Sequence, residues 1–372
     1  MAGLLETLGR VADPRARRGR RHELTCVLAV AVVAVLAGAR NFRQIGSHAQ
    51  DLPAGLLTAL GARFCLRARA RVAPSESRLR WVLQNVDAAA LDLLIGSWLR
   101  EWACRDVDGD LVIALDGKVL RGAWDHTGQV TLFSAVLHTG GITIAQIRIP
   151  NKTNEITQVG ALIEGIDADY ALITVDAAHT QVATAELIAG TKKWDYLMTI
   201  KGNQPGLQQA AIALLAPQVT SREPEHVTTE RDHGRISRWS TWTTPATGIG
   251  FPHATQLACI RRDVLGLAGQ PLTKEFALLI TSATADRCPA PDLARHTRNH
   301  QTVEAGHWIR DTVWTEDSHQ TVTGNGPQVM ATLRNLAIGL LRGSGITRIK
   351  EATEAIARDR TRALPLLSPT TT

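Results

Sequence analysis

Hydrophobic positions recur at helical spacing through the first hundred residues. In the segment Asp87–Arg100, the residues Leu91, Leu94 and Trp98 follow one another at three- and four-residue intervals, which is typical of one helix face. The uncharged run Leu24–Gly38 has no glycine or proline before its end, and its 15 residues fall short of the roughly 20 that cross a bilayer. We therefore expect an all-helical N-terminal region in which this run is a buried helix, with no membrane segment.

The pattern changes to buried strands after residue 110. Two short apolar runs, 111–115 (LVIAL) and 171–175 (ALITV), are each followed directly by an aspartate. Two further β-rich runs, 130–139 and 142–149, are joined by a Gly-Gly pair, which is a hairpin signal. Helical and strand patterns then alternate up to residue 200. Such alternation predicts an α/β domain with a mixed sheet.

This alternation is interrupted by a segment of short β-like runs between turn residues. The interruption predicts a β-rich insertion over about 205–290, after which helical spacing returns and is clearest over 327–341. The chain beyond residue 362 is rich in proline, serine and threonine, so we expect it to fray. We predict a helical domain over 1–105, an α/β domain over 106–345 and a tail over 346–372.

Composition narrows the class of protein. Hydrophobic residues make up 44% and charged residues 20% of the chain, which is ordinary for a folded protein and wrong for a disordered one. The five cysteines are widely spaced with no C-x-x-C pair, which argues against a disulfide framework and favours reduced thiols in the cytoplasm. No H-E-x-x-H or phosphate-loop motif occurs, so a zinc hydrolase and a nucleotide-driven motor are poor readings and no nucleotide cofactor is expected.

Positive charge is concentrated in two arginine-rich stretches near the N-terminus. The net charge of +6 is modest for 372 residues, so its distribution matters more than its size. Guanidinium groups suit bidentate contacts to phosphate, which favours nucleic acid as the partner over a merely solvated face. The first stretch supplies Arg15, Arg17, Arg18, Arg20 and Arg21, and the second supplies Arg63, Arg67, Arg69, Arg71, Arg78 and Arg80.

The aspartates after the two apolar runs are the leading candidates for chemistry. Asp116 and Asp176 each end a predicted buried strand, and α/β proteins place their sites at that edge of the sheet. Two such carboxylates repel each other unless a cation lies between them, and hard oxygen ligands suit Mg²⁺ or Mn²⁺. The plainer alternative is that each aspartate caps a helix or forms a turn. A third acid is open among Glu304, Asp311, Glu316 and Asp317.

Five short motifs, taken in order, resemble one family of transposases. They are LDGKVLRG at 115–122, NKTNEI at 151–156, VDAAHTQ at 175–181, IKGNQP at 200–205 and GNGPQVMATLRNLAIGLLR at 324–342. Together with DPRARRGRRH at 13–22 and AGARNF at 37–42, they are similar to the ISAs-type, or H-repeat-associated, group of DDE transposases of insertion sequences. The resemblance covers nearly the whole chain.

The resemblance implies a ribonuclease H-like catalytic domain with a β-rich insertion. It assigns the three catalytic and metal-binding acids to Asp116, Asp176 and Glu304, the last in the segment HQTVEAGHW at 300–308. Asp116 is expected to contact both of two Mg²⁺ or Mn²⁺ ions, and the other two acids one ion each. The implied partners are the terminal inverted repeats and target DNA, handled by a homo-oligomer on the nucleoid in the cytoplasm.

Polar residues near these motifs are expected to contact DNA, although each has a plainer reading as a surface cation or a cap. They are Lys118, Lys201, Asn203, Gln204, His233, Arg235 and His300.

Two alternatives to an active transposase stay open. The third-acid segment has Gln301 where the family has tryptophan and Ala305 where it has asparagine. These departures allow a catalytically inactive DNA-binding remnant or regulator of related elements. A ribonuclease H-like nuclease that cuts without terminal repeats is the other alternative.

Overall fold

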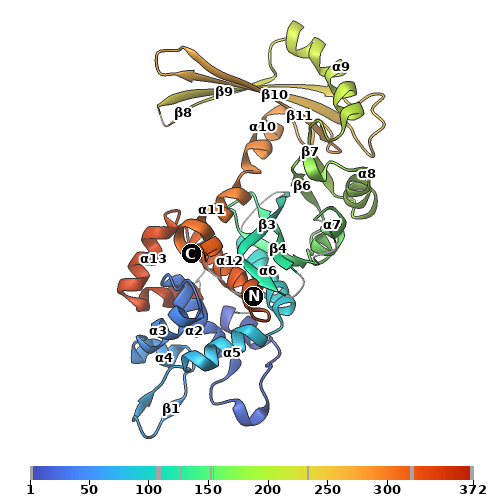
Figure 1. Ribbon diagram of the computed structural model, residues 1–372. Coiled ribbons are helices and arrows are strands. Elements are labelled where there is room, and N and C mark those ends of the chain that lie inside the picture. Colours follow the sequence, from blue (N-terminus) through green and yellow to red (C-terminus); the bar gives the residue numbers. More distant parts are fainter. Residues whose placement is uncertain are drawn as a thin grey trace.

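The computed structural model describes most of the chain. The described residues are 3–105, 110–125, 128–150, 153, 155–232, 234–318 and 322–368. The N-terminal region is built mainly of helices, and Figure 1 shows them at one end of the molecule. They are α1 (Leu4–Gly9), α2 (Leu24–Leu36), α3 (Phe42–Gln50), α4 (Ala54–Ala59), α5 (Glu76–Asn85) and α6 (Ala88–Ala103).

A short hairpin departs from the expected all-helical region. Strands β1 (Phe64–Cys65) and β2 (Ala70–Arg71) pair antiparallel and project from the helices. The turn between them places Arg69 at a positive φ of 50°, a left-handed conformation that is uncommon for residues other than glycine. The expectation of helices alone was therefore incomplete, because two-residue strands leave no periodic pattern to detect.

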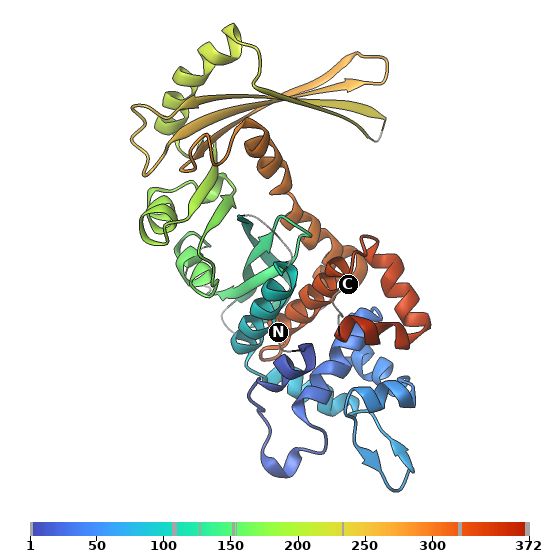
Figure 2. The ribbon, with the colours of Figure 1, turned by 180° about the vertical axis from the view of Figure 1, so that it is seen from behind.

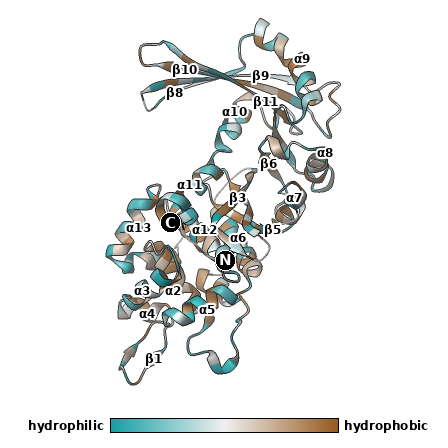
Figure 3. Cartoon of the chain, viewed as in Figure 1, coloured by the Kyte–Doolittle hydropathy of each residue, from teal (hydrophilic) through white to brown (hydrophobic). Residues whose placement is uncertain are grey.

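The buried helix expected at Leu24–Gly38 is confirmed as α2. All of its residues except Thr25 are buried, and its sequence is hydrophobic nearly throughout (Figure 3). No described helix is long and apolar enough to cross a membrane.

One large mixed sheet forms the rest of the framework. Its strand order is β5-β4-β3-β6-β7-β11-β10-β9-β8. The neighbours β3–β6 and β6–β7 pair parallel, and the other described pairs are antiparallel. The strands are β3 (Leu111–Asp125), β4 (Gly128–Leu137), β5 (Thr143–Ile149), β6 (Ala171–Val175), β7 (Asp195–Ile200), β8 (His226–Asp232), β9 (Arg235–Pro245), β10 (Gln256–Gly266) and β11 (Pro271–Thr281).

The predicted insertion extends this sheet and does not form a separate body. It begins with a helix, α9 (Pro205–Ser221), and continues as the strands β8 to β11. The end of β11 returns to pair with β7, with Leu278 opposite Ile200. The insertion strands therefore extend the central sheet beyond β7, on the side away from the N-terminal helices (Figures 1 and 2).

Helices cover the sheet and tie it to the N-terminal region. Helix α6 lies directly on β5, where a Cβ added to Gly96 would stand 2.3 Å from the Ile144 carbonyl oxygen. The segments that follow the sheet strands are α7 (Glu155–Glu164), the 3₁₀ turn η2 (Ala177–His179), α8 (Val182–Ala185), the π-helical turn η3 (Glu186–Thr191), α10 (Ala290–Asn299), α11 (Thr302–Trp314), the 3₁₀ turn η4 (Glu316–Ser318), α12 (Gly326–Gly343), α13 (Ile349–Arg358), the 3₁₀ turn η5 (Arg360–Ala363) and α14 (Leu364–Leu367).

Helix α12 is the central element of the packing. It is buried from Gly326 to Leu341 and packs against α2, α5, α6 and β5. One hydrophobic cluster accordingly runs from Leu4 in the first helix to Leu367 in the last. The N-terminal helices and the sheet therefore share a single core.

The C-terminal segment is folded over most of its described length. Leu366 is 7% exposed and Leu367 is 1% exposed, and α13 contacts both α2 and α12. The expectation of fraying beyond residue 362 was therefore wrong for 363–367, because the proline-rich composition conceals apolar residues that find partners only in the folded chain.

Candidate active site

The two aspartates lie side by side where the parallel pairing of β3 and β6 ends, although β3 was expected to end at residue 115 and in fact continues to Asp125. Strands β3 and β6 are parallel neighbours with Leu115 opposite Val175, so Asp116 and Asp176 occupy the next positions of the same register. Ile113 and Leu115 on β3 are fully buried, and this burial fixes the position of the strand. Asp116 follows them and is only partly buried, so its carboxylate lies at the margin of the core. This arrangement is the one that the strand patterns predicted.

Local hydrogen bonds hold both carboxylates. Asp116 Oδ1 accepts a hydrogen bond from the Gly117 N–H at 2.9 Å. Asp176 caps the 3₁₀ turn η2, accepting from the N–H groups of Ala178 at 3.0 Å and His179 at 3.3 Å. Asp176 thus performs the plainer role of a cap while its exposed carboxylate stays at the sheet edge.

Helix α11 brings the third acid to this edge. Glu304 lies in the first turn of α11 and is exposed, and His307 Nδ1 on the next turn lies 3.6 Å from Asp116 Oδ2. Val303 packs with Ala114 of β3 in a small apolar cluster, so the helix rests on the same strand face. The family resemblance assigned Glu304 to this group, where spacing alone had left four candidates open.

The electrostatics show that Asp116 lies among other carboxylates. Burial is the largest cause that raises the pKa of Asp116 to about 7, and the negative charges of Glu155, Asp176 and Glu304 add to it. In the described residues, no lysine or arginine forms an ion pair with the predicted trio. Oxygen donors with uncompensated negative charge fit a hard divalent cation.

Glu155 is a fourth acid that sequence reasoning missed. It is the first residue of α7, and its Oε2 lies 3.3 Å from His179 Nε2. The carboxylate rests against the backbone of β3, because a Cβ added to Gly117 would stand 1.8 Å from Glu155 Oε1. The signal was available in NKTNEI, one of the motifs that carried the resemblance; its Asn151, Lys152 and Asn154 lie outside the described residues.

An open cleft borders the acids on the side of Glu155. It has a volume of about 490 Å³ and is lined by residues that include Val119, Glu155 and His179. The His179 ring is 2% exposed and stacks on Phe133 with ring centroids 5.2 Å apart. The buried, stacked His179 ring therefore forms one wall of the cleft, next to the carboxylates.

Several predicted DNA contacts have structural partners instead. Asn203 donates to the Ala177 carbonyl at 2.7 Å, and Gln204 donates to the Thr180 carbonyl at 3.0 Å. These two amides brace the turn that follows Asp176, and their expected contacts to DNA stay a prediction. Lys201 is exposed.

His300 is hydrogen-bonded to Thr174, two residues before Asp176. Its Nδ1 is 2.9 Å from Thr174 Oγ1, which also bonds His138 Nε2 at 2.8 Å. Burial lowers the pKa of His300, although the charge of Asp176 opposes that shift. A half-buried, hydrogen-bonded imidazole is poorly suited to the phosphate contact that we expected.

The arginines that were predicted to contact DNA divide into one that is buried and several that are exposed. Arg15 is 3% exposed and bonds Asp13 and the His22 carbonyl, so its expected DNA contact was wrong. Arg20 is exposed, but it also bonds the Arg15 carbonyl at 3.1 Å. The side chains of Arg17, Arg18, Arg21 and Arg235 are exposed, and His233 lies outside the described residues.

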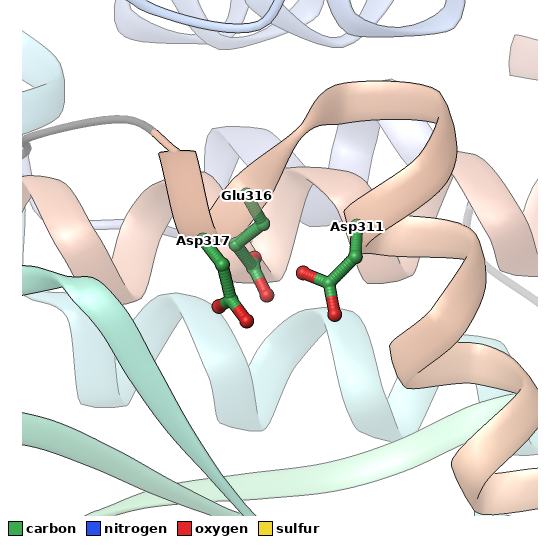
Figure 4. A group of neighbouring side chains, drawn as sticks. All are labelled: Asp311, Glu316 and Asp317. Atoms are coloured by element: carbon green, nitrogen blue, oxygen red, sulfur yellow. The ribbon is translucent and has the colours of Figure 1, made fainter.

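A second acidic group lies near the end of α11 and on the turn η4 that follows it. Asp311, Glu316 and Asp317 have ligand atoms within 4.8 Å of one another (Figure 4), and they were the other candidates for the third acid. Lys118, expected to contact DNA, is instead 7% exposed with its Nζ 2.6 Å from Asp311 Oδ2. Its predicted role was therefore wrong, because the partners come from a helix 193 positions away.

Two family models match the chain, one over the N-terminal region and one over the large sheet and its helices. The model of the family described as "Transposase DDE domain" matches residues 108–340, and the one described as "DDE_Tnp_1-associated" matches residues 5–99.

Individual relatives show the same similarity along nearly the full length. The chain is 26% identical to "Putative transposase YncI" of Escherichia coli O157:H7, across 91% of this chain and 87% of that protein. It is 27% identical to "H repeat-associated putative transposase YhhI" of Escherichia coli K12, across 91% and 90% of the two chains.

A solved structure gives a weaker likeness. It is the piggyBac transposase synaptic complex with hairpin DNA, at a TM-score of 0.42 and 10% identity, covering 99% of this chain and 80% of that one. A likeness at this score carries no argument.

Proposed function

The chain belongs to the family of transposases with a DDE domain, and from that premise we propose that it cuts and joins DNA at the terminal inverted repeats of an insertion sequence. The observation that carries this proposal is the meeting of Asp116, Asp176 and Glu304 at one sheet edge, from three elements distant in sequence. The order of β3, β4, β5, β6 and β7 in the mixed sheet supports a ribonuclease H-like catalytic domain over 106–345.

The donor set supports two divalent cations. Asp116 would contact both ions, and Asp176 and Glu304 would each hold one. Burial and the neighbouring carboxylates raise the pKa of Asp116 to about 7, so these oxygens would hold divalent cations well. When bound, Mg²⁺ or Mn²⁺ supplies activation of the attacking oxygen and stabilisation of the departing one.

The chain's own residues orient the carboxylates of the site. The Gly117 N–H holds Oδ1 of Asp116, while Oδ2 lies 3.6 Å from His307 Nδ1, beyond hydrogen-bond distance, and can face a ligand. The η2 turn, braced by Asn203 and Gln204, fixes the direction of Asp176. No nucleophilic side chain is required, because water or a DNA 3′-hydroxyl attacks the phosphodiester.

The helical end supplies a surface for DNA recognition. Arg17, Arg18 and Arg21 are exposed, and His22, next to Arg21, lies close enough to Arg63 at the base of the hairpin β1–β2 for that charge to lower its pKa. The hairpin itself exposes Arg67 and Arg69. We assign residues 1–105 to binding of the element's ends, and two ends held together call for a homo-oligomer on DNA.

The test is strand cleavage on a labelled duplex that carries the element's own terminal sequence. We expect nicking at the terminus with Mg²⁺, none with EDTA, and none by Asp116→Ala. Asp286→Ala removes an exposed aspartate outside the site and should cut like the wild type.

The outcomes separate the alternatives. Binding of the ends without nicking under any metal condition would identify an inactive DNA-binding remnant. Nicking that ignores the terminal repeats and never joins strands would identify a simple nuclease.

A further inference from the structure

The three acids of Figure 4 already surround a cation of the protein's own. Lys118 Nζ lies 2.6 Å from Asp311 Oδ2, 3.8 Å from Glu316 Oε2 and 3.8 Å from Asp317 Oδ1. The ammonium therefore occupies the place that a metal ion bound by these carboxylates would take.

The charges of this group are balanced. Glu316, which is 5% exposed, is met by Arg310 Nε at 3.0 Å and by Arg334 Nη1 at 2.8 Å. Burial raises the pKa of Glu316, but the charges of Arg310, Arg334 and Lys118 outweigh it and keep the pKa below its usual range. Three acids thus face three buried cations, and a divalent ion would add charge that nothing offsets.

The group joins the two elements that carry catalytic acids. Lys118 follows Asp116 by two residues on β3, so both side chains point to the same face of the strand. Asp311 follows Glu304 by seven residues on α11, so both lie on one face of the helix. The Lys118–Asp311 pair therefore crosslinks the strand of the first acid to the helix of the third.

A second contact along the same line sets the register between strand and helix. His307 Nδ1 lies 3.6 Å from Asp116 Oδ2, four residues before Asp311 on α11. Two strand residues advance about 6.7 Å and four helical residues about 6 Å, so the two contacts match in spacing. With both contacts in place, α11 cannot slide along β3 without separating Lys118 from Asp311 and His307 from Asp116.

The crosslink is anchored on its far side. Arg310 Nη1 donates to Asn335 Oδ1 at 3.0 Å, and Arg334 Nη2 donates to the Arg40 carbonyl at 2.9 Å. The group is thereby bound to the central helix α12 and to the loop between α2 and α3. Its position is fixed by the core and not by α11 alone.

We propose that Lys118 is a positioning residue, whose ammonium clamps α11 against β3 and sets Glu304 at its working distance from Asp116. The acids Asp311, Glu316 and Asp317 are the counter-ions of this clamp and not a cation site. The clamp stands on the contacts above; its effect on cleavage rests on the proposed transposase function. A buried ion group adds little net stability, but its geometry is strict, which suits a role in alignment.

Hydrogen exchange tests the clamp without reference to activity. Lys118→Met keeps an unbranched side chain, one atom shorter, and removes the charge. We expect amides of 302–314 to exchange at least tenfold faster, while amides of α9 are unchanged. Lys350→Met, which removes an exposed lysine on α13, should change neither segment. Unchanged exchange over 302–314 in Lys118→Met would overturn the proposal.

Cleavage kinetics test the consequence for the site. With Lys118→Met we expect the half-saturating Mg²⁺ concentration to rise at least tenfold, with affinity for DNA within twofold of the wild type. A loss of stability alone does not move the metal dependence in this way. If the wild type cuts no DNA, the proposed function fails, and hydrogen exchange still decides the clamp.

Two further variants cover the other outcomes. Asp311→Asn weakens one contact at a side chain that is 33% exposed, so it replaces Lys118→Met if that variant does not fold. In an Asp116→Ala background, we expect Mg²⁺ to leave the melting temperature unchanged. A Mg²⁺-dependent rise that Asp311→Asn abolishes would show that the acids bind a cation, and the clamp would be wrong.

Discussion

Single residues decide how the acids are placed, and Gly117 is the sharpest case. The backbone of this glycine is in contact with the Glu155 carboxylate, whose Oε1 would stand 1.8 Å from an added Cβ. The obstructing group is the far end of a flexible side chain, so it can move aside at little cost. A methyl group at this position would therefore displace an acid while leaving the fold intact.

Gly117→Ala is accordingly expected to separate stability from activity. We predict a change of less than about 1 kcal/mol in the free energy of unfolding in urea, and up to about a hundredfold loss in cleavage rate. Gly206→Ala, where nothing lies within 4 Å of the new Cβ, should match the wild type in both. Wild-type cleavage by Gly117→Ala would show that the position of Glu155 is irrelevant to the reaction.

His138 predicts how stability responds to acid. Burial lowers the pKa of His138 to about 3, so the folded protein holds it neutral, whereas the unfolded chain protonates it below about 6.5. Stability is therefore lost as the pH falls below 6.5. At pH 5 the expected loss from this residue is about 2 kcal/mol.

The measurement is urea unfolding at pH 7.5 and pH 5. His138→Gln should lose about 2 kcal/mol less than the wild type between these two conditions. His253→Gln, at a ring that is 42% exposed, serves as the control and should follow the wild type. Equal acid losses in all three proteins would contradict the neutral, buried state of His138.

At the scale of elements, the hairpin β1–β2 is the feature whose function is easiest to isolate. It exposes Arg67 and Arg69 next to Leu66, which is 85% exposed. A two-stranded ribbon fits a DNA groove, and arginines at its tip neutralise phosphates. The periodic pattern of the sequence did not reveal the hairpin, although the arginines themselves pointed to nucleic acid.

Replacing both tip arginines by glutamine should weaken DNA binding in a salt-dependent way. Each lost phosphate contact lowers the slope of log K against log salt by about 0.9, so we expect a reduction of about 2 in total. Binding to the terminal duplex at several salt concentrations measures this slope. Glutamine at Arg78 and Arg80 on α5 gives a matched pair, and equal slopes in both double variants would exclude a special role for the hairpin.

The pairing partners of the insertion strands could not be predicted from their own sequence. The sequence predicted a β-rich interruption over about 205–290, and those strands are present. Its pattern did not reveal that β11 would pair with β7 and continue the central sheet. Strand partners of this kind are chosen by contacts between residues some 80 positions apart, which leave no local signature.

At the scale of the whole molecule, the C-terminal helices complete the core of the N-terminal region. Ile349, Ile356, Leu366 and Leu367 are each at most 7% exposed, and α13 lies against α2. Burying each such side chain contributes about 1.5–3 kcal/mol, so four of them amount to at least about 6 kcal/mol. That is a large share of the stability of an ordinary domain.

A chain ending at Gly345 should therefore fail to fold stably. We predict a loss of the cooperative thermal transition or a fall of more than about 10 °C in its midpoint. A chain ending at Ser368, which keeps the described helices, should melt like the full chain. An unchanged midpoint for the shorter chain would contradict the shared core.

The sequence by itself determined the features that depend on neighbouring residues. The buried helix α2, the apolar strand runs that precede Asp116 and Asp176, and the helix carrying Glu304 follow from apolar periodicity and from motifs a few residues long. Tertiary structure alone decided which charges meet. Lys118 turned from an expected DNA contact into a buried ion-pair partner, Asn203 and Gln204 brace the turn after Asp176, and Glu155 joined the acids. These pairings depend on how strand and helix ends from distant parts of the chain are packed together.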